Sequence, residues 1–119
     1  MKLLTDLDRH RLLTNGMTNG ARAADGEDTL DFHPVVKLFC PWGAATWLLT
    51  ELDPQDPDLA FGLCDLGFGT PELGSVRLSE LQSVRGPGGL TIERDLHFTA
   101  DKTLTAYAYE ARQHSGIRA

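Results

Sequence analysis

The sequence has only two cysteines, Cys40 and Cys64, and it has no long hydrophobic run. Two thiols cannot build the disulfide framework of a small secreted domain, and they match no paired spacing of a zinc site. No stretch approaches the roughly 18 consecutive apolar residues of a membrane-spanning helix. The charged N-terminus also lacks the apolar core of a signal peptide. These absences predict a cytoplasmic protein with reduced thiols and no membrane partner.

Basic residues are scarce, because 11 Lys and Arg stand against 17 Asp and Glu, which gives a net charge of −6. The deficit is concentrated in residues 34–76, where Lys37 accompanies six acidic residues and the net charge is −5. A negative field repels phosphate backbones and attracts basic surfaces, although it also simply keeps small proteins soluble. The sequence therefore disfavours direct DNA binding and favours a protein partner with a basic surface.

The chain has 119 residues, which is the length of one domain. Alternating apolar residues, separated by turn residues, predict strands over 35–40, 46–52, 59–66 and 73–78, and the alternation returns over 90–98. Strands this close in sequence pair antiparallel, because parallel pairing needs a long crossover. Helical patterns cover 3–13, 78–85 and 104–112. We predict a single α+β domain over residues 1–119, with a mostly antiparallel sheet of four or five strands and N-terminal, short middle and C-terminal helices.

Glycine positions and chain ends predict the irregular segments. Residues 14–31 hold three glycines and two Asn-Gly pairs, so we expect Asn15-Gly16 to end the first helix and a loop to follow, either mobile or in contact with a partner. Gly62 lies inside a strand pattern and indicates a bulge or a close backbone contact. Residues 113–119 are predicted to fray.

Residue types suited to covalent or metal chemistry are present without the spacing that such chemistry requires. Cys40 or Cys64 can be paired with His33 or His97 as a nucleophilic dyad, but both cysteines lie in apolar runs, where cysteine is usually a small core hydrophobe. The four histidines have no metal-binding spacing, and the acidic turn at 53–58 lacks the glycine and glutamate of a calcium loop. The sequence therefore predicts no catalytic residue, no metal and no cofactor.

Glu93, Arg94 and Asp95 form an acid-base-acid run shortly after the glycine-rich break at 86–89. In an extended segment the two carboxylates share one face and Arg94 points to the other. Such a pair binds a hard cation or transfers protons in some proteins, and forms surface ion pairs in most. The alternative to a binding module is therefore a metal-dependent hydrolase or nuclease that uses Glu93, Asp95 and Asp65.

The two tryptophans differ in their predicted environments. Trp47 lies within a strand and is predicted to belong to the core. Trp42 lies in the loop at 40–45, where it either folds onto the core or serves as an exposed anchor for a partner. An exposed apolar patch around Trp42, or around Tyr107 and Tyr109, would instead favour an accessory domain of a larger assembly.

Five blocks of the sequence carry a family resemblance: PVVKLF at 34–39, ATWLLTELDPQDPD at 45–58, AFGLCDLGFGTPELG at 60–74, LSEL at 78–81 and RGPGGLTIERDLHF at 85–98. Together they resemble the bacterial domain-of-unknown-function family numbered 2958, from which Thr70 and Thr91 are mild departures. The resemblance implies a small bacterial protein, often encoded on plasmids and integrative elements. It implies no mechanism. The residues that match its blocks are Trp47, Glu51, Glu72, Arg85, Glu93, Arg94 and Asp95.

These observations predict a small acidic binding module, not an enzyme, that contacts a basic protein involved in nucleic-acid handling or defence. Its carboxylates would occupy the places that phosphates take on such a surface. This hypothesis expects the surplus carboxylates to form one contiguous surface of the sheet. The residues assigned to the contact are Trp42, Glu51, Asp53, Asp58, Glu72, Arg85, Glu93, Arg94 and Asp95.

Overall fold

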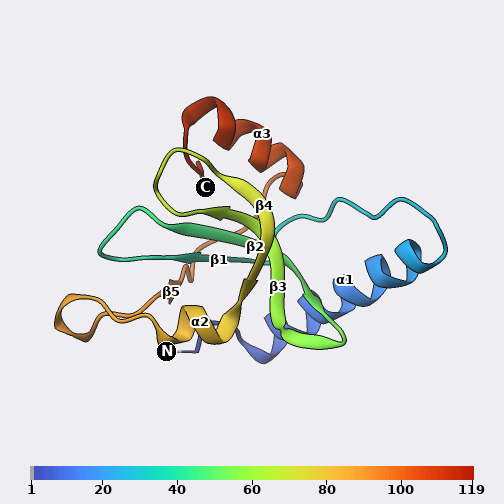
Figure 1. The fold of residues 1–119 in the computed structure, drawn as a ribbon, viewed down its shortest axis with the longest axis horizontal. Helices are drawn as coiled ribbons and strands as arrows, with labels where there is room; N and C mark the ends of the chain where they lie inside the picture. The colour runs from blue at the N-terminus through green and yellow to red at the C-terminus, as the bar shows by residue number, and fades with distance from the viewer. Residues whose placement is uncertain (1) are drawn as a thin grey trace.

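A five-stranded antiparallel sheet forms the centre of the protein, for which a computed structural model describes residues 2–119 (Figure 1). The strand order is β4-β3-β2-β1-β5. The elements in chain order are α1 (Asp6–Ala24), β1 (Val36–Phe39), β2 (Thr46–Asp53), β3 (Asp56–Asp65), β4 (Glu72–Arg77), α2 (Leu78–Ser83), the 3-10 turn η1 (Pro87–Gly89), β5 (Glu93–Arg94) and α3 (Leu104–His114). The predicted α+β class and antiparallel sheet are confirmed. Within residues 2–119, no helix has the length and apolar content needed to span a membrane.

The two faces of the sheet pack against different helices, because successive side chains of a strand point to opposite faces. On one face, Trp47 and Leu49 of β2 belong to a core that also contains Leu12 of α1 and Leu81 of α2. We call this the α1/α2 face. On the other, the α3 face, Leu48 lies in a second core with buried residues of α3. The sheet is therefore covered by helices on both sides, with α3 above it and α2 below it in Figure 1.

Strand β2 contains a bulge at Thr50. The register is regular up to Leu49 and resumes with Glu51 opposite Phe61, so Thr50 has no partner of its own on β3. The extra residue shifts the alternation of side chains by one position. As a result Leu52 returns to the core of the α1/α2 face, while Glu51 shares the α3 face with Phe61.

Gly62 lies on β3 directly opposite the last regular residue before this bulge. A Cβ atom on Gly62 would lie 1.9 Å from the carbonyl oxygen of Leu48, so no side chain fits there. The bulge and the close backbone contact that the sequence offered as alternatives therefore occur together.

Helix α1 is longer than the sequence predicted. Thr5 caps its start, because the Thr5 hydroxyl accepts the Asp8 N–H at 3.0 Å and the Asp8 carboxylate accepts the Thr5 N–H at 3.1 Å. The predicted end at Asn15-Gly16 is wrong, since the helix continues to Ala24 through half of the segment assigned to a loop. Gly16 packs against β2, where a Cβ atom would lie 1.9 Å from the Leu52 carbonyl oxygen. The glycine thus serves a close helix–strand contact instead of a turn.

Helix α1 also covers an edge of β2 that has no strand partner. Strand β1 pairs with β2 only as far as Leu49. Beyond this point the Asn15 side-chain amide donates to the Thr50 carbonyl oxygen at 3.0 Å, and Gly16 lies on Leu52. An unpaired strand edge exposes backbone polar groups that need partners. We call residues 50–53 with these α1 contacts the covered edge.

The C-terminal residues differ from their prediction as well. The tail predicted to fray lies against the sheet, because Asp65 accepts the Ile117 N–H at 3.0 Å and Lys37 donates to the Ala119 carbonyl oxygen at 2.6 Å. The alternating segment at 90–98 forms only the two-residue strand β5, which pairs with β1.

Candidate functional site

The structure does not gather the predicted carboxylates on one surface. Asp53 and Asp58 lie beside the β2–β3 turn, whereas Asp65 ends β3 and Glu72 begins β4 at the other end of the sheet. Asp65 lies seven residues after Asp58 on the same strand, which corresponds to roughly 23 Å. The negative charge is therefore divided between two ends of the sheet, and each carboxylate has to be considered separately.

Asp58 stabilises the start of α2. Its carboxylate accepts the Ser79 N–H at 2.9 Å and the Ser79 hydroxyl at 2.7 Å, and it lies 3.7 Å from Arg77. The hydrogen bonds from Ser79 are the main reason that the pKa of Asp58 lies below its usual value. The spacing of Ser79 and Gln82 is that of a capping box, but both residues lie inside α2: the N-cap residue is Arg77, and its side chain makes no capping hydrogen bond.

Asp65 anchors the C-terminal tail. Its side chain is 4% exposed in the folded protein, and it accepts the backbone N–H groups of Gly67 at 2.8 Å and Ile117 at 3.0 Å. Asp65 and Glu93 lie in one cross-strand row, but β2 and β1 lie between their strands. Three strand spacings place the two backbones roughly 14 Å apart. Within residues 2–119, no group of three His, Cys, Asp or Glu side chains is arranged to hold a metal ion.

The run around β5 is bonded into the fold. Arg94 donates to the Lys2 carbonyl oxygen at 2.7 Å, and the Asp95 carboxylate lies 3.5 Å from the Lys37 ammonium. Glu93 is half-buried on the neighbouring position of the same short strand. The structure therefore brings Glu93 and Asp95 near each other without adding Asp65.

Trp42 and Arg85 support the loop after α2. Trp42 is half-buried and stacks on Gly86, where a Cβ atom would lie 2.5 Å from the indole ring. Arg85 donates to the carbonyl oxygens of Gln82 at 2.6 Å and Val84 at 3.0 Å, which satisfies groups that the helix end leaves free. Trp42 is thus not an exposed anchor, and Arg85 is engaged with its own backbone.

The cysteines are both free and half-buried. Burial raises the pKa of the Cys64 thiol, which disfavours the thiolate that a nucleophile needs. Cys64 instead lines a hollow beside β4.

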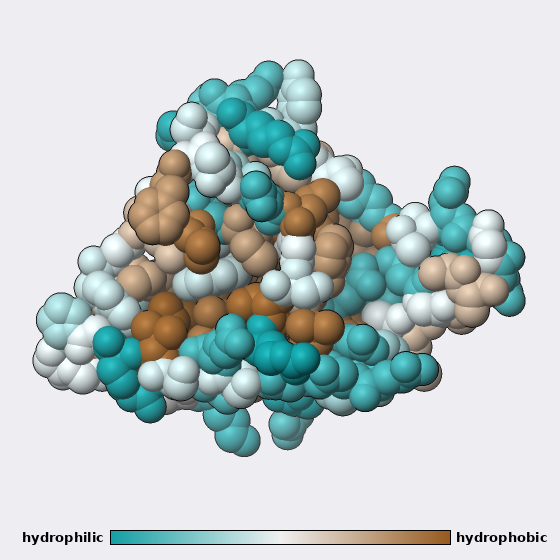
Figure 2. Space-filling model, in the orientation of Figure 1, coloured by the Kyte–Doolittle hydropathy of each residue, from teal (hydrophilic) through white to brown (hydrophobic). Residues whose placement is uncertain are grey.

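This first hollow, the β4 groove, has a volume of about 450 Å³ and lies between β4 and α2. Leu66 and Phe68 form one wall and are 59% and 83% exposed, which is unusual for side chains of this size. Glu72 and Glu80 are the charged residues of the lining. Figure 2 shows apolar surface on this side of the molecule, between the hydrophilic surfaces of α2 below and α3 above.

The backbone of β4 is open along the same groove. β4 is the outermost strand of the sheet, six residues long, and its pattern of exposure is that of a strand without a further neighbour. Its interior carries no proline and no lysine, which are residues that commonly protect sheet edges from pairing. We call this strand side the open edge.

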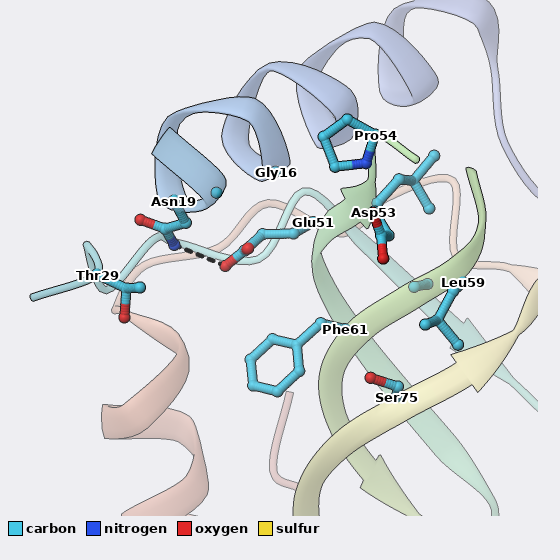
Figure 3. A pocket seen from close by; sticks show the side chains of 12 residues that line it. Gly16, Asn19, Thr29, Glu51, Asp53, Pro54, Leu59, Phe61 and Ser75 are labelled. Atoms are coloured by element: carbon cyan, nitrogen blue, oxygen red, sulfur yellow. Dashed lines mark hydrogen bonds between the residues drawn. The ribbon is translucent and has the colours of Figure 1, made fainter. Parts of the chain in front are cut away.

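The second hollow is a cleft of about 340 Å³ between α1, β2 and β3, which we call the Glu51 cleft (Figure 3). Glu51 Oε2 accepts a hydrogen bond from the Asn19 side-chain amide at 2.8 Å. Burial raises the pKa of Glu51, and the Asn19 bond opposes this shift in part. Phe61 lies opposite Glu51 on β3 and borders the same cleft.

A family model described as "Protein of unknown function (DUF2958)" matches residues 3–118. The chain belongs to this family. The match confirms the resemblance carried by the five sequence blocks. No curated protein and no solved structure matches the chain with significance. The description of DUF2958 assigns no activity, so a function for this member has to be argued from its geometry.

Several side chains of the two hollows in this DUF2958 member were not singled out from the sequence. The sequence predicts Asn19 in the loop at 14–31, Phe61 in the strand at 59–66 and Glu80 in the helix at 78–85, and it assigns no element to Phe68. The sequence signal for Phe68 is its position between Gly67 and Gly69. Glycines on both sides indicate that this large apolar residue does not belong to a regular strand. The sequence carries no signal for Asn19, because its partners Leu30 and Glu51 come from other segments.

Proposed function

We propose that this protein is a non-enzymatic protein-binding module that holds an extended, basic segment of its partner along the open edge of β4. The observation that carries the proposal is the coincidence of an unpaired six-residue edge strand with an apolar groove. The charged residues that line this groove, Glu72 and Glu80, are both acidic.

The backbone of β4 supplies a general means of binding. An added strand forms a ladder of main-chain hydrogen bonds with an open edge, and its alternate side chains enter pockets beside that edge. The other edge strand, β5, has only two residues, so it offers a much shorter ladder. Phe68 and Leu66 supply apolar contact area at the side of β4, as the anchors of protein interfaces do.

The charges of the groove select the partner. None of the ion pairs within residues 2–119 includes Glu72 or Glu80. Their charges are therefore not neutralised by the fold, and lysine or arginine side chains of a docked strand would meet them. The net charge of −6 steers a basic partner toward the protein and makes the association rate dependent on salt.

The family resemblance supports a setting for this contact. Proteins of bacterial mobile elements that handle nucleic acid, or defend against it, carry basic surfaces that bind phosphates. We place the partner in this class and the encounter in the bacterial cytoplasm. The acidic groove would compete for such a surface.

The test is a selection of short random peptides displayed on phage against the full chain. The expected outcome is enrichment of peptides that alternate apolar and basic residues, with amide signals of β4 shifted most in NMR spectra of the complex. Binding is expected to weaken steeply as salt rises. Enrichment of peptides without basic residues, or shifts confined to another surface, would contradict the proposal.

A charge-reversal pair provides the matched control. Glu72→Lys with Glu80→Lys is expected to weaken binding of the selected peptides at least tenfold. Glu27→Lys with Asp28→Lys makes the same change in net charge on the exposed segment after α1 and is expected to leave binding close to that of the wild type. Equal loss in both double variants would reduce the effect to overall charge and overturn the assignment to the groove.

A further inference from the structure

The Glu51 cleft contains negative charge that the fold does not neutralise. Two carboxylates line it, those of Glu51 and Asp53, and among residues 2–119 no Lys, Arg or His lines it. None of the ion pairs within residues 2–119 includes either residue. A carboxylate in a partly desolvated position is stabilised when a cation approaches it. The cleft therefore has the electrostatic character of a site for a positively charged group.

The Glu51 carboxylate is held in a fixed orientation. Asn19 donates to its Oε2 atom, and Asn19 is itself fixed by the backbone of Leu30, which donates to the Asn19 oxygen at 2.7 Å and accepts from its amide at 3.1 Å. Asn19 is only 5% exposed, so this support is well buried. The Oε1 atom of Glu51 accepts no hydrogen bond within residues 2–119 and remains available to a ligand.

An aromatic ring lies beside this carboxylate. Glu51 and Phe61 are directly opposite on β2 and β3, and Figure 3 shows the Phe61 ring beside the Glu51 carboxylate, with Asp53 on the other side of the ring. The ring is partly exposed, so its face is accessible. Aromatic faces attract ammonium and guanidinium groups, and they also cover the apolar stems that carry them.

The rest of the lining distinguishes an organic cation from a bare metal ion. Leu59 and Pro54 contribute apolar surface, and Gly16 lets α1 close the cleft at the backbone of Leu52. The lining supplies two carboxylates, and within residues 2–119 no group of three His, Cys, Asp or Glu side chains is arranged to hold a metal ion. A volume of about 340 Å³ is at the lower end of the range for small-ligand pockets.

We propose that the Glu51 cleft binds an organic cation, with an ammonium or guanidinium group on Glu51 Oε1 and its apolar stem against Phe61. Ser75 lines both hollows, but Glu51 and Phe61 do not line the β4 groove, and the site does not depend on the function proposed for that groove. The same chemistry is found in a free amine and in the lysine or arginine side chain of a protein. Both sources are therefore tested.

The experiment titrates the full chain with agmatine, which carries a guanidinium and an ammonium group on an alkyl stem, and follows binding by calorimetry and by the Asn19 side-chain amide signal. Saturable binding is expected, with at least a tenfold loss in Glu51→Gln. Phe61→Leu is expected to lose affinity by a smaller factor. Asp6→Asn removes one negative charge from the exposed first turn of α1, outside both hollows, and is expected to bind agmatine as the wild type does.

A second arm titrates an acetylated, amidated peptide with one central arginine. Binding of the peptide tenfold tighter than agmatine assigns the cleft to a side chain of a partner, and tighter binding of agmatine assigns it to a free amine. The proposal is overturned if neither compound saturates the protein, if Glu51→Gln binds as well as the wild type, or if Asp6→Asn loses as much affinity as Glu51→Gln. Each of these results leaves the β4 groove untouched, because its test uses other residues.

Discussion

The covered edge of β2 and the open edge of β4 face the same physical problem in different ways. Both present strand backbone that has no strand neighbour on one side. On β2, α1 approaches so closely that Gly16 touches the Leu52 carbonyl, and Asn15 satisfies the Thr50 carbonyl. On β4, no element pairs with the outer side, and Phe68 lies 83% exposed next to it.

The difference indicates what each edge does. Natural sheets generally protect their edges from pairing, and here α1 protects the edge of β2. An edge left open beside exposed apolar side chains is therefore better explained by a partner than by the stability of the isolated chain. The predictions below separate the structural role of the covered edge from the binding role of the open one.

The largest effect is expected for Gly16→Ala at the covered edge. The added Cβ atom would overlap the Leu52 carbonyl oxygen, so α1 has to move away from β2, at a cost of about 3 kcal/mol in the free energy of unfolding. Gly20→Ala in the same helix has no atom within 4 Å of the added Cβ and should stabilise the protein by about 0.5–1 kcal/mol. Urea unfolding measures both. If Gly16→Ala stabilises the protein as Gly20→Ala does, the packing of α1 does not depend on this contact.

Asn19→Ala is expected to have the second largest effect. It removes both hydrogen bonds to the Leu30 backbone and the support of Glu51, and buried polar groups without partners cost about 2 kcal/mol. Thr18→Ala, which removes a hydrogen bond within the exposed side of the same helix, provides the control and should cost clearly less. A loss of unfolding free energy no greater than that of Thr18→Ala would show that the hydrogen bonds of Asn19 do not stabilise the fold.

The pH dependence of Glu51→Gln sharpens the comparison further. Burial raises the folded pKa of Glu51 above its usual 4.5, so the folded protein holds this proton more tightly than the unfolded chain does. The contribution of Glu51 to stability is then fully present below that usual value and is lost as pH rises through the folded pKa. The stability of the wild type minus that of Glu51→Gln should fall as pH rises above the usual pKa and through the folded pKa, and the change should be small because the group is half-exposed. Paired urea titrations at several pH values measure it, and a difference that grows with pH would refute the assignment.

The smallest effect on stability is expected at the open edge. Leu66→Ser with Phe68→Ser should change the free energy of unfolding by less than about 0.5 kcal/mol, because neither side chain lies in a core. The same double variant should bind less hydrophobic dye and lose the peptides selected on the β4 groove. Leu7→Ser, at an exposed leucine of α1, should keep those peptides. A large loss of stability in the double variant would mean that Phe68 supports the fold and is not kept for a partner.

The strands of this fold follow directly from the sequence, whereas the extent of α1 does not. Alternation of apolar residues marks β1 to β3, because each of these strands buries side chains in a core, and β4 alternates between exposed and half-buried residues. The two Asn-Gly pairs in α1 are typical of turns when taken alone. Here Gly16 and Asn19 are required by contacts with Leu52 and Leu30, which no local pattern contains.

The residues of the two candidate sites were likewise only partly predictable from the sequence. Glu51 and Glu72 were identified from charge and from the family blocks, and each lines one of the two hollows. Asp58 and Asp65 have the same charge, but their oxygens are bonded to backbone groups of Ser79 and Ile117. A carboxylate that fixes a chain segment cannot be distinguished by sequence from one that is free, because the donor comes from a distant residue.

The bulge at Thr50 determines which face of the sheet the later side chains of β2 point to. If the same residues paired regularly, without the bulge, Glu51 would lie opposite Ala60, so Glu51 would point into the core of the α1/α2 face and Leu52 would point away from it. The bulge, and not only the identity of the residues, thus decides whether this strand tolerates a charge. Deletion of Thr50 should leave both faces unchanged, because Glu51 would then follow Leu49 directly and still lie opposite Phe61.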